Sequence, residues 1–75
     1  MKQLQRLNQI GEKHIGMLAQ SGLLTMIGDK GQKVLQPAQK ITGYEIVYNF
    51  GEPELMFIIN GDSVYENTCF NFKKE

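Results

Sequence analysis

The sequence has little of what small stapled or metal-bound domains use. Among its 75 residues there are one cysteine, one histidine, two prolines and no tryptophan. Because a single cysteine, Cys69, cannot form an internal disulfide, the chain does not belong to the disulfide-stabilised secreted scaffolds. One histidine and one cysteine cannot provide the three or four nitrogen and sulfur ligands of a structural zinc site. We therefore expect neither a metal site nor a cofactor.

Long apolar segments are also missing. No apolar run approaches the ~18 residues that are needed to span a membrane. Residues 1–6 lack the apolar core of a signal peptide. These features predict a cytoplasmic protein that has no membrane partner.

The overall composition is that of a globular chain. Hydrophobic residues make up 41% and charged residues 21%, and 8 basic residues balance 8 acidic ones. The length predicts a single domain, residues 1–75, which buries only about 60% of the surface that the unfolded chain exposes. Because so small a core leaves little room for a substrate pocket, we do not expect an enzyme.

The charge is unevenly distributed along the chain. Residues 1–40 carry six basic and two acidic side chains, a net charge of +4, whereas residues 41–75 carry two basic and six acidic ones, a net charge of −4. Two solvated halves that attract each other within one fold explain this pattern. The alternative is a bipolar surface that orients a partner or a second copy of the chain.

Residues 2–20 have the period of an amphipathic helix. The apolar side of this helix contains Leu4, Leu7, Ile10, Gly11, His14, Ile15, Met17 and Leu18. A glycine in the middle of that side, Gly11, destabilises a helix by roughly 1 kcal/mol relative to alanine. The close approach of another backbone at this position would compensate for that cost. Ser21-Gly22 is typical of a helix end.

The period then changes to that of strands. Residues 23–27 and 32–36 flank a loop at 28–31 that has glycine at both ends. Residues 41–50 alternate between apolar and polar side chains, and residues 55–59 follow a break at 51–54. Asn60-Gly61 predicts a tight hairpin turn, because both residues accept positive φ. A last strand is expected at residues 62–72.

Two turns set the expected strand pairing. A two-residue turn at 60–61 places Phe57 opposite Val64, and a four-residue loop at 51–54 places Tyr48 opposite Phe57. Both turns put the same apolar residues on one face of the sheet, and this face should receive the helix. Its members are Ile46, Tyr48, Phe50, Leu55, Phe57, Ile59 and Val64.

These elements predict an α+β fold in which the N-terminal amphipathic helix packs on an antiparallel β-meander of four to five strands. One alternative fits the same order of elements. It is a small, strongly bent barrel with the helix as a plug, of the general kind seen in Sm-like and SH3-like folds.

The opposite face of the sheet is the candidate binding surface. The expected pairing places Val47 opposite Ile58, and Met56 opposite both Asn49 and Tyr65. An apolar centre with a polar rim is typical of a protein–protein contact, whereas a solvated sheet face is polar. The residues that we expect to contact a partner are Val47, Met56, Ile58 and Tyr65, together with Glu45 and Asn49. The alternative is that residues 23–27 and 32–36 fold across this face and bury it.

No set of residues predicts catalysis. His14 lies among apolar helix residues without an orienting acid or a nucleophile nearby in the sequence, which is typical of a histidine at the edge of a core. Cys69 lacks the electropositive surroundings or the helix N-terminus that activate a thiol. We therefore expect no catalytic residues.

The sequence predicts a small non-enzymatic protein-binding module, a stoichiometric inhibitor or adaptor that occupies a protein partner, alone or as a homodimer. Mobile genetic elements such as phages often encode compact inhibitors of this size, an analogy of size and architecture. The alternative is a nucleic-acid-binding regulator, which the neutral total charge makes the less favoured reading. Its basic face would contain Lys2, Arg6, Lys13, Lys30 and Lys33.

Overall fold

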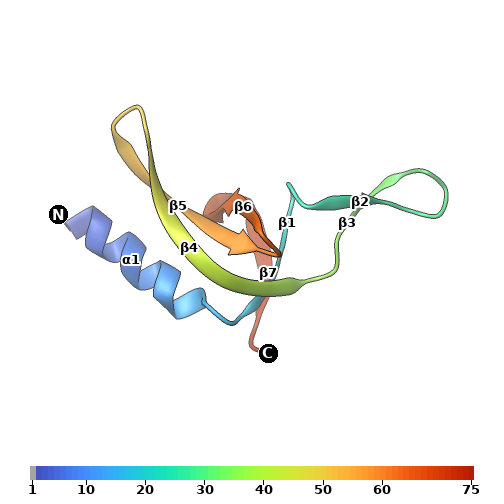
Figure 1. The fold of residues 1–75 in the computed structure, drawn as a ribbon, viewed down its shortest axis with the longest axis horizontal. Helices are drawn as coiled ribbons and strands as arrows, with labels where there is room; N and C mark the ends of the chain where they lie inside the picture. Colours follow the sequence, from blue (N-terminus) through green and yellow to red (C-terminus); the bar gives the residue numbers. More distant parts are fainter. Residues whose placement is uncertain (1) are drawn as a thin grey trace.

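The computed structural model describes residues 2–75, Lys2 by its backbone only. It contains one N-terminal helix, then strands, with a short 3-10 helix before the last of them (Figure 1). This order confirms the predicted α+β fold. The elements are α1 (Lys2–His14), β1 (Leu18–Ser21), β2 (Thr25–Ile27), β3 (Lys33–Leu35), β4 (Gln39–Asn49), β5 (Glu52–Ile59), β6 (Asp62–Tyr65), η1 (Glu66–Thr68) and β7 (Cys69–Lys73).

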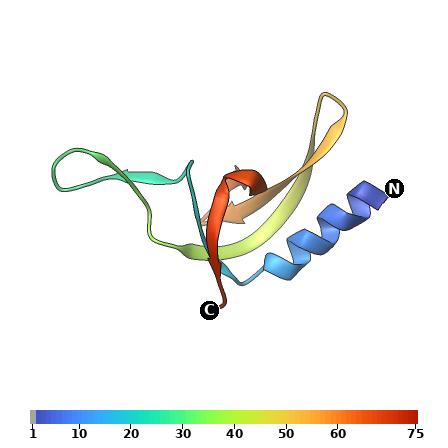
Figure 2. The same cartoon turned by 180° about the vertical axis from the view of Figure 1, so that it is seen from behind.

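Five of the strands form one antiparallel sheet, in the order β6-β5-β4-β1-β7, and β2 and β3 form a separate two-stranded sheet. β4 is long and strongly curved, and the β2–β3 hairpin projects away from it (Figures 1 and 2). The edge strands β6 and β7 do not pair with each other anywhere in residues 2–75. The sheet is therefore open, and the closed-barrel alternative is wrong.

The helix ends earlier than predicted, at His14 instead of residue 20. Gly16 has a φ of +90°, which glycine adopts without steric cost, and its N–H donates to the carbonyl of Ile41 at 2.8 Å. The next carbonyl, of Met17, accepts from the Ile41 N–H at 2.8 Å. Met17 and Leu18 continue the apolar period of the helix in the sequence, but pairing with β4 and β7 draws Leu18 and the three residues after it into β1.

The apolar side of α1 lies on the sheet as expected. Leu7 and Ile10 pack against the buried core, and Gly11 is buried. A Cβ added at Gly11 would lie 2.5 Å from the ring carbons Cγ and Cδ2 of Tyr44. The predicted close approach therefore exists, but an aromatic ring makes it, so the expectation of a second backbone is wrong.

The pairing of β4 with β5 differs from the prediction. Asn49 pairs with Glu52, so the hairpin turn consists of Phe50 and Gly51, both with positive φ, and the expected four-residue loop at 51–54 is wrong. Tyr48 consequently lies opposite Pro53. Next to the turn, each β4 residue pairs with a β5 residue that is an even number of positions from the predicted partner. Because side chains alternate between the two faces of a strand, most of them keep the face that the sequence predicts.

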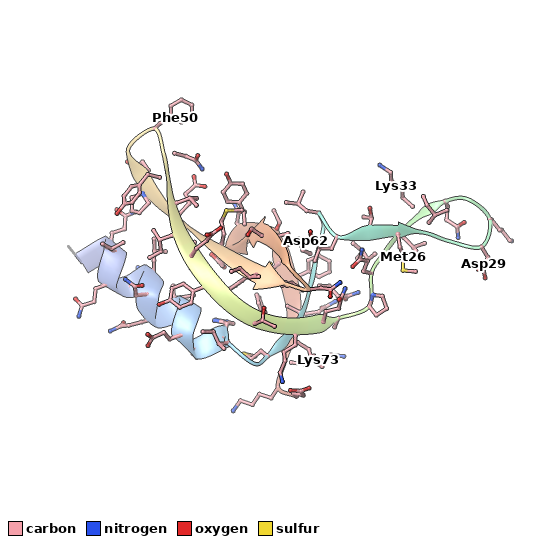
Figure 3. The ribbon with its side chains drawn as sticks, in the orientation of Figure 1. Met26, Asp29, Lys33, Phe50, Asp62 and Lys73 are labelled. Atoms are coloured by element: carbon pink, nitrogen blue, oxygen red, sulfur yellow. The ribbon has the colours of Figure 1, made fainter. Side chains whose placement is uncertain are left out.

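The core lies between α1, the inner face of β4–β6, and strands β1 and β7. Four members of the predicted apolar face are buried, and Ile46 packs against them half-buried. Tyr48 is 58% exposed and Phe50 is fully exposed, so their assignment to the core is wrong. Both lie at the tip of the β4–β5 hairpin, where Figure 3 shows Phe50 pointing away from the sheet. The buried apolar residues are Ala19, Leu24, Ile41, Leu55, Phe57, Ile59 and Val64.

The predicted last strand, 62–72, is two strands with η1 between them. Ser21 in β1 is buried, and its Oγ–H donates to Thr68 Oγ1 at 2.9 Å while its Oγ accepts the N–H of Leu23 at 3.1 Å. The hydroxyl of Thr68 donates in turn to the carbonyl of Tyr65 at 2.6 Å. These bonds close the turn that carries the chain from one edge of the sheet to the other.

Candidate protein-binding face

The three strands β4, β5 and β6 define the face that lies opposite the helix, called here the outer face. Glu45 pairs with Met56, which pairs with Tyr65, and Gly43 pairs with Ile58. Val47 pairs with Glu54 and not with Ile58, so the predicted pairing is wrong although the face is the one expected. The outer face consists of Gly43, Glu45, Val47 and Asn49 on β4, Glu52, Glu54, Met56 and Ile58 on β5, and Ser63 and Tyr65 on β6.

All six residues of the predicted binding set lie on this face. Five of them are half-buried and Glu45 is exposed; the half-buried residues are Val47, Asn49, Met56, Ile58 and Tyr65. Asn49 does not oppose Met56, as the sequence suggested, but lies at the end of β4 near the hairpin turn.

No element of residues 2–75 covers the outer face. The helix packs on the other face, where its Asn8 Oδ1 accepts the Tyr44 hydroxyl at 3.0 Å. β2 and β3 pair only with each other and extend away from the curved sheet (Figures 1 and 2). The alternative in which these two strands fold across the outer face is therefore wrong.

Hydrogen bonds fix the polar side chains at one end of the outer face. The amide nitrogen of Asn49 donates to Glu54 Oε2 at 3.0 Å and to the hydroxyl of Tyr65 at 3.1 Å. An aromatic ring held by its hydroxyl loses little conformational entropy on binding, so Tyr65 is suited to act as an anchor. Glu54 was not in the predicted binding set, because the predicted loop at 51–54 removed it from the strand.

A shallow groove of about 190 Å³ lies beside Tyr65, between the helix and the start of β5. It is smaller than the 300–1,000 Å³ typical of small-molecule sites and is large enough for a side chain of a partner. Its lining consists of Leu7, Pro53, Glu54, Leu55, Tyr65, Glu66 and Asn67.

The outer face has acidic side chains and no lysine or arginine. Glu45 flanks its apolar centre on β4, and Glu52 and Glu54 lie toward the hairpin end of β5. Lys40, at the start of β4 and beyond the ten residues of the outer face, forms an ion pair with Glu75 at 2.9 Å. A complementary partner would therefore present apolar side chains with positive charge beside them.

The two chemically distinctive residues are both part of the packing. His14 Nδ1–H donates to the Ile10 carbonyl at 2.7 Å, and its ring centroid lies 5.4 Å from that of Phe57 and 4.8 Å from that of Phe72. Burial raises the pKa of the Cys69 thiol above its ordinary value, so that the thiol stays protonated at neutral pH. Neither arrangement resembles an activated group.

Neither a metal-binding cluster nor a membrane-spanning helix is found in residues 2–75. Residues 2–75 contain no group of three or more histidine, cysteine, aspartate or glutamate side chains that could hold a metal ion. In the same range, no helix is long and apolar enough to cross a membrane.

Comparison with known proteins adds no relative. No protein-family model matches the chain, and no curated protein or solved structure matches it either.

Proposed function

We propose that this chain is a small non-enzymatic protein-binding module that occupies a protein partner through the outer face. One observation carries the proposal: an apolar sheet surface around Met56, Ile58 and Tyr65 has no covering element among residues 2–75. An uncovered sheet face is normally polar, and an apolar centre with a charged rim is the pattern of a protein contact. A stoichiometric inhibitor or adaptor is the mode of action that suits a chain of this size. An origin in a mobile genetic element and a cytoplasmic location belong to the same proposal.

The alternative partner, nucleic acid, has weaker support. Arg6 and Lys13 lie on α1, whereas Lys30 and Lys33 lie on the β2–β3 hairpin at the other end of the molecule, which is 48 Å long (Figure 1). Binding to single or double strands requires a continuous basic track, and the outer face between these ends is acidic. Binding of random-sequence DNA that falls steeply with added salt would favour this alternative over a protein partner.

The substitution Ile58→Asp tests the proposal. Because Ile58 lies half-buried on the open outer face and outside the core, the variant should remain folded. It should lose roughly 2 kcal/mol or more of binding free energy, about thirtyfold in affinity, as expected for the centre of an interface.

The measurement is quantitative capture of partners from a lysate of the native host, with circular dichroism to verify folding. Ile15→Asp is the matched control, because Ile15 is 46% exposed and lies in the link between α1 and β1, not among the residues of the outer face. The control should capture the same partners as the parent chain. Equal capture by a folded Ile58→Asp variant would refute the proposal.

A further inference from the structure

The β2–β3 hairpin, called here the arm, exposes apolar side chains that nothing in residues 2–75 covers. Met26 is 47% exposed, Ile27 67% and Leu35 41%. In Figure 3 the arm carries Met26, Lys33 and, at its tip, Asp29, all apart from the curved sheet. An isolated two-stranded hairpin is marginally stable in water, so an arm of this kind gains stability when another surface covers it.

One face of the arm is amphipathic. Thr25 pairs with Leu35, and Ile27 pairs with Lys33, so these four side chains share a face, called here the arm face. All four are exposed. Ile27 and Leu35 are diagonal neighbours and form its apolar centre, with the ammonium group of Lys33 beside them.

The arm face and the outer face are complementary. The outer face combines an apolar centre with Glu45, Glu52 and Glu54, and it has no basic residue. The arm combines its apolar centre with two lysines, Lys30 and Lys33, against a single carboxylate at its tip. Contact between the two would bury apolar area on both sides and bring opposite charges together.

The geometry requires that such a contact form between two molecules. The arm leaves the sheet at the end opposite the β4–β5 hairpin tip and points away from it (Figures 1 and 2). It therefore does not lie on the outer face of its own chain, which was the alternative that the sequence left open.

We propose that the arm of one copy packs on the outer face of a second copy, with Lys33 next to Glu45 of that copy. A two-fold axis makes the exchange reciprocal, so that both arms and both outer faces are covered in a closed dimer. This inference rests on the proposed function, because it names a second copy as an occupant of the same outer face. Glu45 is chosen because it is exposed and pairs with Met56 in the apolar centre, whereas Glu52 lies at the hairpin turn and Glu54 is engaged by Asn49.

Charge reversal across the contact is the decisive test. In a Lys33→Glu homodimer, each of the two contacts would place the introduced carboxylate next to Glu45 of the other copy. In a Glu45→Lys homodimer, each contact would place Lys33 next to the introduced lysine of the other copy. Each variant alone should therefore dimerise at least about tenfold more weakly than the parent chain. An equimolar mixture of the two variants should form a heterodimer that is bound more tightly than either variant homodimer. One of its two contacts then joins the introduced carboxylate to the introduced lysine, and the other restores the parental pair of Lys33 with Glu45.

Sedimentation equilibrium measures the dissociation constants, and native mass spectrometry with one isotopically labelled chain detects the heterodimer. Lys74→Glu is the matched control, since this exposed lysine lies outside both faces and should leave dimerisation unchanged. Ile27→Asp, on the arm and outside the core, should abolish the dimer while circular dichroism shows a folded chain. A dimer that responds to none of the arm variants would overturn the inference.

The inference and the proposed function can fail separately. A parent chain that stays monomeric overturns the second-copy contact, and the proposed function then still stands if Ile58→Asp loses a different protein partner. If Ile58→Asp alters neither self-association nor partner capture, both fail.

Discussion

Replacement of Gly11 by alanine should destabilise the protein, against the preference of an isolated helix. In a helix interior, alanine is favoured over glycine by about 1 kcal/mol. Here, however, the new methyl group would lie 2.5 Å from the Tyr44 ring, far inside contact distance. That ring packs on the core, and its hydroxyl is bonded to Asn8, so it cannot swing aside freely.

Overpacking of this kind costs about 1–3 kcal/mol. After subtraction of the helix preference, the free energy of unfolding should fall by up to about 2 kcal/mol. Urea unfolding followed by circular dichroism measures this change through the midpoint. Gly22→Ala is the matched control, because a Cβ there would meet nothing within 4 Å, and its stability should be unchanged or increased by about 0.4–1 kcal/mol. Equal stabilisation by both substitutions would refute the packing of α1 on β4.

Three other perturbations test the turns and the core. Gly61→Val should cost well over ~1 kcal/mol of unfolding free energy, because Gly61 has a φ of +83°; a parental melting temperature would refute the turn. Ser21→Ala should cost about 1–3 kcal/mol, because the hydroxyl is buried and the N–H of Leu23 loses its acceptor; urea unfolding shows the loss, and Ser63→Ala on the exposed surface should show none. Burial raises the pKa of the Cys69 thiol in the folded protein. The stabilisation that the buried, protonated thiol provides is therefore complete below the ordinary thiol pKa, and it is lost as the pH rises through the raised pKa of the folded state. The melting temperature between pH 7 and 11 should therefore fall less for Cys69→Ala than for the parent chain, and parallel curves would contradict the burial.

The sequence predicted the faces of the sheet better than its pairing. The side-chain period of a strand is two, so the displaced register left Val47, Met56 and Ile58 on the face that was expected. The turn at Phe50-Gly51 was missed because a phenylalanine with positive φ is not a recognisable turn signal. The same error removed Glu54 from the candidate site.

Contacts between distant parts of the chain account for the other differences. The helix was extended past Gly16 because Met17 and Leu18 fit the helical period, whereas β1 depends on pairing with β4 and β7. Thr68, in the break between β6 and β7, is bonded to Ser21, which lies 47 residues away in the chain. Local periodicity contains no information about either contact.

Site-specific cross-linking tests most directly whether the outer face contacts another polypeptide. Ser63 is exposed, lies on the outer face opposite Ile58 and can carry a photoreactive benzoylphenylalanine without loss of a buried contact. Irradiation in the native host should join this position covalently to a second polypeptide, whether a partner protein or another copy. The same group at Gln9, on the exposed side of α1, should give no adduct. An unmodified chain after irradiation at position 63, or equal adducts from positions 63 and 9, would contradict the account.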